Sequence, residues 1–361
     1  MEYEVIDGKG IIPDGTTEIA FQAFKGCNSL QSIEIPDSVT KIGWSAFEGC
    51  TCLQSIEIPD SVTEIEQWAF KGCVSLQSIV IPDSVTVVAG SAFWNCDNLT
   101  SIIVSNNNSK YKSTNNCFLT KDGKEILFCR NHNIPDSVTE IGEWAFQGCT
   151  SLRSIVIPNS VTKIGKSAFH DCTSLQSIVI PDSVTEIGRW AFAHCTSLQS
   201  IEIPDSVTQI DGSVFCRCNN LTSIIVSKNN SRYKSTNNCI LTKDGKKLVL
   251  CRNHNIPNGI TEIGRFAFSG CTSLQSIEIP NSVTEIGYSA FGGCTSLQSI
   301  EIVTQEKELD LSLERIEYLL QALSEYSKGF SLRVPIGCDD AYRHYPAFEG
   351  KFKKIIADID A

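Results

Sequence analysis

Long apolar runs are missing from this 361-residue sequence. No stretch approaches the roughly 18–20 consecutive apolar residues that a membrane-spanning helix requires, so we expect no membrane insertion. The opening residues, MEYEVIDGKGIIPDG, also lack the basic start, apolar core and cleavage site of a secretion signal. Either the protein is cytosolic, or a signal has been removed.

Basic residues are in deficit. The sequence has 30 Lys and Arg residues against 41 Asp and Glu residues, a formal net charge of −11 and a pI near 5.0. Nucleic-acid binding through phosphates needs a net basic face, so we expect no nucleic-acid partner. The same deficit argues against electrostatic docking onto an anionic membrane. A hydrophobic content of 42% is nevertheless typical of a chain that folds.

Catalytic motifs are absent as well. The sequence contains no G-x-S-x-G, H-E-x-x-H or P-loop pattern. His132 and His254 each follow a cysteine at ligand-like Cys-x-x-His spacing, but no four-ligand set for structural zinc is evident. We therefore predict a protein that is not an enzyme and that has no cofactor and no metal.

An internal repeat dominates what is present. Prolines recur every 23 residues, apart from two intervals of 53, at Pro13, Pro36, Pro59, Pro82, Pro135, Pro158, Pro181, Pro204, Pro257 and Pro280. The two long intervals, which begin at Pro82 and Pro204, each hold 30 additional residues. A larger unit of 122 residues therefore consists of four repeats and one insertion.

One repeat, Pro158 to Ile180, reads PNSVTKIGKSAFHDCTSLQSIVI. Its L-x-x-I-x-I run predicts a short strand, because Ile178 and Ile180 share one face at the period of two. The next proline ends the strand. Gly165 is expected to permit a tight bend, and Phe169 to fill the core from a short helical turn. No single repeat can bury its own apolar face, so stacked coils must share one continuous core.

These residues resemble the BspA-like (Treponema-type) leucine-rich repeat family, whose pattern is close to L-x-x-I-x-L-P-x-x-L-x-x-I-G-x-x-A-F-x-x-C. The resemblance covers roughly residues 11–302 in ten copies. It implies a right-handed α/β-type solenoid with a parallel β-sheet and short helical turns. It also implies a non-enzymatic, cell-surface or secreted module, expected to be monomeric, that binds host matrix proteins or bacterial surface proteins. An intracellular, cytoplasmic scaffold or effector is the alternative.

The predicted segments follow the repeat boundaries. They are an N-terminal flank (1–12), repeats 1–4 (13–104), a β-hairpin insertion (105–133), repeats 5–8 (134–226), a second hairpin insertion (227–255), repeats 9–10 (256–302) and a C-terminal α+β cap (303–361). Tyr3, Val5 and Ile6 predict a short edge strand in the flank. The cap is predicted to contain a helix near 312–327, a strand at 331–337, a short helix at 339–345 and a further turn at 348–356.

Ten of the 17 cysteines occupy one repeat position and form what we call the cysteine ladder: Cys27, Cys50, Cys73, Cys96, Cys149, Cys172, Cys195, Cys218, Cys271 and Cys294. Equivalent side chains of adjacent coils stack about 5 Å apart. Parallel, in-register side chains rarely offer the dihedral angle near 90° that a disulfide needs. We interpret the ladder as buried thiols that act as small hydrophobes, with disulfides or metal ligation as alternatives.

Four more cysteines flank the hairpin turns. With residues 122–123 as a two-residue turn, Cys117 and Cys129 fall one residue out of register and on opposite faces. They are therefore predicted to stay reduced, as are Cys239 and Cys251, although a β-bulge would allow each pair to join. We expect nearly all 17 cysteines to titrate as thiols in denatured, unreduced protein.

The residue between the two apolar residues that end each strand should point onto the concave face. These candidate contact residues, the strand-face residues, are Glu34, Glu57, Val80, Ile103, Val156, Val179, Glu202, Ile225, Glu278 and Glu301. The glutamates are either a solvated exterior or an acidic strip for a basic partner. We expect the hairpins to cover Ile103 and Ile225, with an exposed contact patch as the alternative.

All five tryptophans fall near the Ala-Phe positions of the repeats: Trp44, Trp68, Trp94, Trp144 and Trp190. Packing at the edge of the predicted helical turn is the expected role. A row of partner-binding residues is the alternative, because tryptophan is enriched in binding hot spots.

Overall fold

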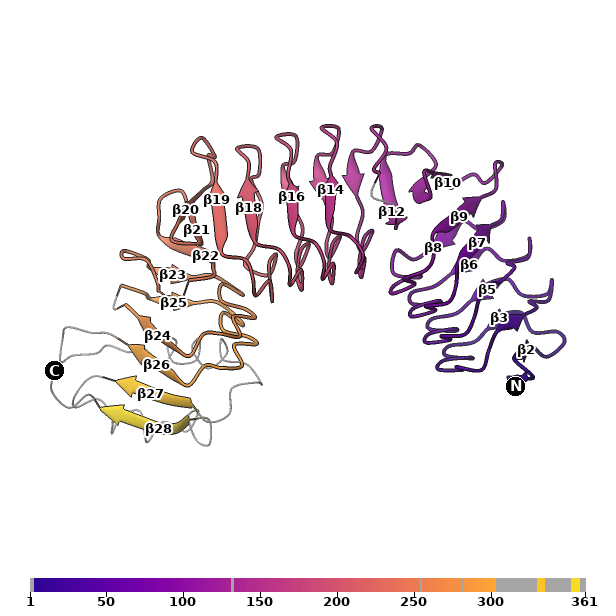
Figure 1. Ribbon diagram of the computed structural model, residues 1–361, viewed down its shortest axis with the longest axis horizontal. Helices are drawn as coiled ribbons and strands as arrows, with labels where there is room; N and C mark the ends of the chain where they lie inside the picture. The colour runs from indigo at the N-terminus through magenta and orange to yellow at the C-terminus, as the bar shows by residue number, and fades with distance from the viewer. Residues whose placement is uncertain are drawn as a thin grey trace. The chain divides into compact units, whose positions relative to one another are not determined.

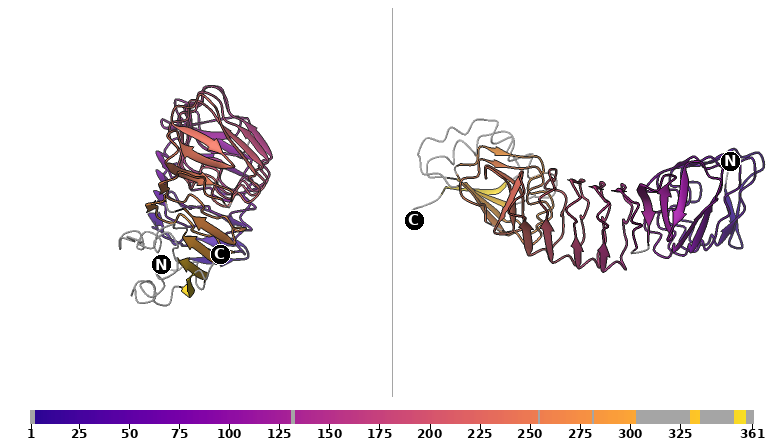
Figure 2. Two further views of the ribbon diagram at one scale, coloured as in Figure 1. Left: turned by 90° about the vertical axis from the view of Figure 1, so that its left-hand side faces the viewer. Right: turned by 90° about the horizontal axis from the view of Figure 1, so that it is seen from above.

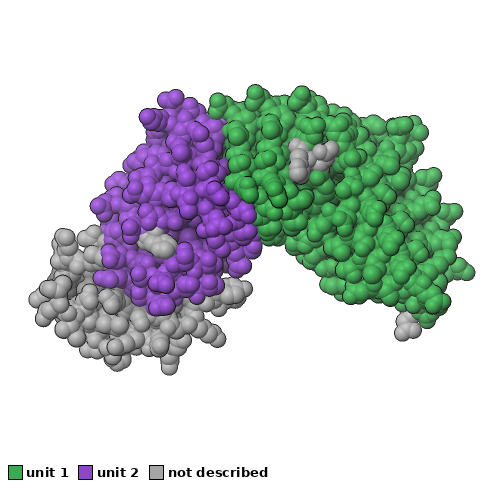
Figure 3. All heavy atoms as spheres, viewed as in Figure 1, with its two compact units in different colours: residues 1–184 green, residues 185–361 purple. Residues whose placement is uncertain are grey.

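The computed structural model describes residues 3–130, 133–253, 255–280, 282–302, 330–334 and 352–357. The chain divides into two compact units, residues 1–184 and 185–361 (Figure 3). Each unit is a solenoid in which short strands of successive coils lie side by side (Figures 1 and 2). The solenoid predicted from the repeat is therefore confirmed.

The strands of the first unit are short. They are β1 (Glu4–Ile6), β2 (Lys9–Ile11), β3 (Glu18–Ile19), β4 (Ser32–Ile33), β5 (Lys41–Ile42), β6 (Glu64–Ile65), β7 (Ser78–Ile81), β8 (Val87–Val88), β9 (Ser101–Val104), β10 (Tyr111–Thr114), β11 (Cys117–Thr120), β12 (Glu125–Cys129), β13 (Glu140–Ile141), β14 (Ser154–Val156), β15 (Lys163–Ile164) and β16 (Ser177–Val179).

The second unit is built in the same way. Its strands are β17 (Glu186–Ile187), β18 (Ser200–Ile203), β19 (Ser223–Val226), β20 (Tyr233–Thr236), β21 (Cys239–Thr242), β22 (Lys247–Cys251), β23 (Glu262–Ile263), β24 (Ser276–Ile279), β25 (Glu285–Ile286), β26 (Ser299–Ile302), β27 (Phe330–Val334) and β28 (Phe352–Ala357).

Equivalent strands pair in parallel, in the register of the repeat. In β7 and β9, Ile79 lies opposite Ile102 and Val80 opposite Ile103. Alternate residues of these strands are buried and exposed, as the period of two predicts. A second series of two-residue strands pairs in the same way, for example β5 with β6. The apolar side chains of both series point into a shared core.

The Ala-Phe segment is not helical, and no residue that the structure describes lies in a helix. Some of its amide groups make local turn bonds, as where Glu48 N–H donates to the Ser45 carbonyl oxygen at 3.1 Å, and they alternate with amides that bond to the neighbouring coil, as where Phe47 N–H donates to the Ala69 carbonyl oxygen at 2.7 Å. The residue before the alanine has a positive φ, 59° at Trp68 and 65° at Trp144, which a right-handed helix does not allow. The predicted helical turn is therefore wrong, because bonds to the neighbouring coil take every second amide and prevent a continuous helical hydrogen-bond pattern.

The core is organised around stacked phenylalanines. Phe24, Phe47, Phe70 and Phe93 are fully buried, with ring centroids 5.3–5.7 Å apart and interplanar angles of 5–8°. Gly165 also has a role other than the predicted bend, since a Cβ there would lie 2.8 Å from the Ile141 carbonyl oxygen of the preceding coil. Glycine thus allows the coils to approach closely.

Each insertion forms three antiparallel strands that rejoin the solenoid. In the first, β10, β11 and β12 pair in order, and β12 then pairs in parallel with β13 of the next coil. The buried Asn108 side chain anchors the insertion, because its amide donates to the carbonyl oxygens of Pro82 and Val85 while its oxygen accepts from the Tyr111 N–H. Asn230 repeats these contacts in the second insertion.

Both ends of the described chain add strands to a sheet. The edge strand predicted from Tyr3, Val5 and Ile6 is β1, which pairs with β2, and β2 pairs in parallel with β4. At the other end β27 and β28 extend the sheet of β24 and β26. The strand prediction at 331–337 is thus confirmed for 331–334, whereas the turn predicted at 348–356 is wrong over residues 352–356. The predicted helices at 312–327 and 339–345 lie outside the described residues.

Candidate interaction surfaces

The structure places the strand-face residues on the outer side of the strands, in register between coils. Val80 pairs with Ile103, Val156 with Val179, Glu202 with Ile225 and Glu278 with Glu301, so that these four coil-to-coil steps bring like positions side by side within each unit. Glu34 follows β4 directly, and Glu57 occupies the same position in the next coil. Glu34, Glu57, Glu202 and Glu278 are exposed, and Glu301 is half-exposed.

Two neighbouring valines are the most exposed apolar members of this surface. Val156 in β14 is 81% exposed and Val179 in β16 is 76% exposed. Large apolar side chains at such exposure, side by side on a hydrogen-bonded sheet, mark a surface suited to contact with another protein.

The hairpins do not cover the isoleucines that precede them. Ile103 and Ile225 are 51% and 52% exposed. The hairpin strands bond instead to the last residues of β9 and β19, where Ser113 Oγ accepts from the Val104 N–H and Ser235 Oγ from the Val226 N–H. The expectation that these isoleucines are covered is therefore wrong.

An acidic groove lies at the start of the first unit. Its volume is about 830 Å³, and its lining includes Lys9, Glu34, Asp37, Glu57 and Asp60. Lys9 Nζ lies 3.2 Å from Glu34 Oε2, but both side chains are mostly exposed, so this ion pair adds little stability. Three carboxylates remain in the groove beside that pair.

The cysteine ladder lies along the Ala-Phe turns as free thiols. Cys50, Cys73 and Cys96 donate their S–H groups to the carbonyl oxygens of phenylalanines in the preceding coil, at 3.0–3.1 Å. Cys27 is half-buried, whereas the remaining nine ladder cysteines are buried. Burial raises the pKa of Cys50 and of Cys96 to about 12.

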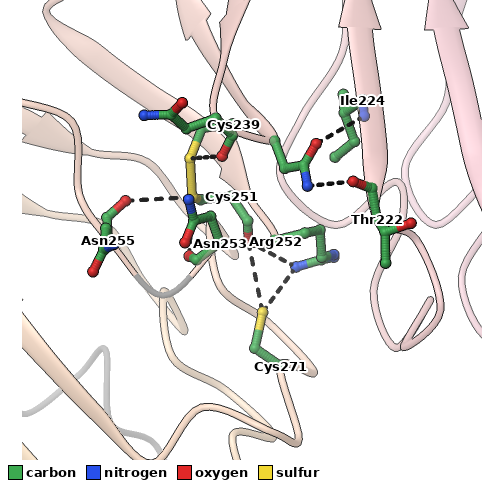
Figure 4. Close-up of a disulfide and its surroundings, with 10 residues drawn as sticks. Thr222, Ile224, Cys239, Cys251, Arg252, Asn253, Asn255 and Cys271 are labelled. Carbon is green, nitrogen blue, oxygen red and sulfur yellow. Dashed lines mark hydrogen bonds between the residues drawn. A yellow bond between two sulfur atoms is a disulfide. The ribbon is translucent and has the colours of Figure 1, made fainter.

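The first ladder cysteine after each hairpin has a different partner. Arg130 Nη1 lies 2.9 Å from Cys149 Sγ, and Arg252 Nη1 lies 3.3 Å from Cys271 Sγ (Figure 4). Arg252 also donates to the Phe215 carbonyl oxygen at 2.6 Å. These arginines fill the space next to the ladder where the insertion interrupts the regular stacking of coils.

The hairpin cysteines are joined, contrary to the prediction from their spacing. Disulfides link Cys117 to Cys129 and Cys239 to Cys251, the latter shown in Figure 4. The expected register holds near the turn, where Leu119 pairs with Ile126, but it shifts by one residue between Phe118 and Leu119. This bulge places Cys117 directly opposite Cys129. At most 13 of the 17 cysteines can therefore titrate before reduction.

In the parts of the chain that the structure describes, no group of three His, Cys, Asp or Glu side chains could hold a metal ion. The sulfur atoms of Cys129 and Cys251 are used by the disulfides. His132 and His254, which completed the Cys-x-x-His spacing, lie outside the described residues.

Native-state alkylation should separate the ladder from an exposed cysteine. We expect iodoacetamide at pH 8 to modify Cys52, which is exposed and free, and to leave Cys50 and Cys96 unmodified, because their burial excludes the reagent and suppresses the thiolate. Tandem mass spectrometry of tryptic peptides measures the result, because fragment ions separate Cys50 from Cys52 on the peptide that they share, and denaturation should make all three reactive. Modification of Cys50 as fast as Cys52 would contradict a buried ladder.

The tryptophans belong to continuous rows of rings that also include Phe21, His170, Phe266 and Tyr288, which were not predicted from the sequence. In the first unit neighbouring ring centroids are 5.5–6.4 Å apart along what we call the aromatic column, which consists of Phe21, Trp44, Trp68, Trp94, Trp144 and His170. In the second unit Trp190, Phe266 and Tyr288 are spaced by 6.4 and 5.9 Å. The tryptophans of the first unit thus pack against one another, and Trp190 packs against Phe266.

Comparison with known proteins agrees with this architecture. The model of the BspA type leucine rich repeat region matches residues 9–123, 124–240 and 247–313. The chain belongs to the BspA-type leucine-rich repeat family. Among curated proteins none matches it.

Two solved structures illustrate the fold. A leucine-rich repeat protein from Eubacterium ventriosum is 24% identical, with a TM-score of 0.53 over 84% of this chain and 85% of that one. The pneumococcal vaccine antigen PcpA is 19% identical, with a TM-score of 0.52 over 92% of this chain and 68% of that one. The described part of this BspA-type chain contains no helix long and apolar enough to cross a membrane.

Proposed function

We propose that this BspA-type protein is a non-enzymatic adhesion module that acts as a monomer at the cell surface or outside the cell. Its strand-face residues contact a host matrix protein or a bacterial surface protein. The observation that carries the proposal is the exposed pair Val156 and Val179, held in register on a parallel sheet. Such a surface offers apolar contact area at low entropic cost, because the sheet is already ordered before binding.

Two further observations support an extracellular location. Disulfides persist in oxidising compartments and are rare in the cytosol, so the two hairpin disulfides favour the outside of the cell over an intracellular scaffold. The structurally similar pneumococcal protein is described as a vaccine antigen, which is in keeping with exposure on a cell.

A valine-to-glutamate double variant tests the strand face. We expect V156E/V179E to bind at least about tenfold more weakly than the wild type, because two charges would be buried against the partner. The measurement is capture of the full chain on a panel of purified extracellular matrix proteins and bacterial surface extracts, followed by titration of each positive.

Thr162→Glu is the matched control. Thr162 is an exposed β-branched residue in the same coil as Val179, outside the strand-face row. It should leave capture unchanged. Equal capture of V156E/V179E and wild type would reject the strand face as the contact surface, and no capture of wild type on any surface would reject adhesion.

A further inference from the structure

The aromatic column does not arise simply from copying one repeat. Trp44 lies two residues before the alanine of its Ala-Phe pair, Trp68 directly before the alanine, and Trp94 directly after the phenylalanine. Duplication of coils would reproduce a ring at one fixed position. Here three non-equivalent positions supply rings to one row, with centroids 5.6 and 6.0 Å apart.

Basic side chains of the chain itself lie over the faces of these rings. Lys71 Nζ is 4.7 Å from the centroid of Trp68 and 4.5 Å from that of Trp94. Lys166 Nζ lies 5.5 Å from the Trp144 centroid. These distances are those of cation–π contacts, so the faces of the column are sites that favour a cation.

The second unit repeats the arrangement with arginine. The guanidinium carbon of Arg265 lies 6.0 Å from the Phe266 centroid and 5.8 Å from the Tyr288 centroid. Tyr288 occupies the same repeat position as Trp44, two residues before the alanine. The repeat position that Trp44 occupies in the first unit therefore holds, in the second unit, a ring that contacts an arginine side chain.

A pocket of about 330 Å³ opens beside Trp44. Its lining consists of Trp44, Glu64, Ile65, Glu66, Gln67, Val87 and Ala89, so it offers an aromatic face, two carboxylates and no basic side chain. Trp44 is 43% exposed, which leaves a large part of its ring accessible. The volume is at the lower end of the range for small-ligand sites and has room for one long side chain.

The charge around this pocket is unbalanced. Lys41 Nζ lies 2.7 Å from Glu66 Oε1, but 3.8 and 3.9 Å from the nearest carboxylate oxygens of Glu18 and Glu64. One ammonium group thus faces three carboxylates, of which Glu64 and Glu66 line the pocket, and Glu66 Oε2 is held beside the indole by the Trp44 backbone N–H at 2.7 Å. A cationic occupant would neutralise the excess negative charge, whereas a neutral glycan would leave it in place.

We propose that the Trp44 pocket binds a lysine or arginine side chain from an extended basic segment of a partner protein. The cation stacks on the Trp44 indole and pairs with Glu64 and Glu66. The site is separate from the strand-face residues and rests on the proposed function only in that its occupant is a protein.

Two short peptides test this directly with the full chain. One is a capped Gly/Ser heptapeptide with a central arginine, and the other has citrulline in its place, which keeps the shape and removes the charge. The five tryptophan indole N–H resonances of ¹⁵N-labelled protein report binding site by site at millimolar peptide. We expect the arginine peptide to shift the Trp44 resonance, and the citrulline peptide to bind roughly tenfold more weakly.

Variants with matched controls locate the site. Trp44→Ala, followed through the Trp68 resonance, and Glu64→Gln should each weaken the arginine peptide by roughly fivefold. Tyr288→Ala and Glu285→Gln, at the same repeat positions in the second unit, should change its affinity by less than about twofold. Because the charges are near the surface, added salt should weaken binding of the arginine peptide.

Several outcomes would overturn the proposal. These are equal binding of the arginine and citrulline peptides, unchanged binding in both pocket variants, or a Trp44 shift with a neutral oligosaccharide and not with the peptide. V156E/V179E should bind the peptide like wild type. Unchanged matrix-protein capture by V156E/V179E, with peptide binding intact, would therefore reject the proposed adhesion surface alone.

Discussion

Replacement of Phe70 by alanine should lower the free energy of unfolding by about 3–5 kcal/mol, the range for phenylalanine-to-alanine changes in a close-packed core. Phe70 is fully buried between the stacked rings of Phe47 and Phe93, at centroid distances of 5.3 and 5.7 Å. Its loss opens a cavity that borders both neighbouring coils. Because solenoid stability depends on nearest-neighbour interfaces, the effect should extend to the coils on either side. Urea unfolding followed by circular dichroism measures it.

Val179→Ala is the control for this prediction. The side chain of Val179 is 76% exposed, so its truncation should change stability by no more than about 0.5 kcal/mol. A loss below about 1 kcal/mol for Phe70→Ala would show that the coils collapse around the missing ring. The continuous phenylalanine stack would then not be the main support of the core.

Removal of the second hairpin disulfide, by replacing Cys239 and Cys251 with alanine, should cost about 3 kcal/mol. The two cysteines are 12 residues apart in sequence. Closing a loop of about that length lowers the entropy of the unfolded chain, which stabilises the folded state by about 3 kcal/mol. Both side chains are fully buried, and alanine introduces no polar side-chain atom that would need a hydrogen-bond partner. Urea unfolding measures the loss, and hydrogen exchange should localise it to β20, β21 and β22.

Cys52→Ala is the control, because Cys52 is exposed and free and its removal breaks no cross-link. It should leave stability unchanged. If the double-alanine protein were as stable as oxidised wild type, the hairpin would be held by its packing alone. Reduction of wild-type protein should then also have no effect on the unfolding midpoint.

The repeat made most of the fold predictable. Apolar residues at fixed positions, such as Ile178 and Ile180, specify which side of each strand is buried, and a strict 23-residue period specifies parallel, in-register stacking. The turn at Phe169 was predicted wrongly because a helix and a ladder of inter-coil hydrogen bonds satisfy the same backbone groups. The two cannot be distinguished from the spacing of side chains alone.

The sites were less predictable because they depend on departures from the repeat. An ideal hairpin register separates Cys117 from Cys129, and only the bulge after Phe118 brings them together. The tryptophans were expected to pack near the Ala-Phe positions, but their stacking into one column was not predicted, for a related reason. Trp44, Trp68 and Trp94 occupy different positions in the 23-residue pattern, so aligning the repeats hides a row that appears when the coils are stacked.

The return of each insertion to the solenoid has a consequence at the level of the gene. β12 pairs in parallel with β13, and β22 pairs in the same way with β23, so each 122-residue block ends by rebuilding the edge from which the next begins. Recombination between such similar blocks can add or delete a whole block while leaving every junction compatible. Alleles that differ by steps of 122 residues would fold equally well and would differ in the length of the solenoid.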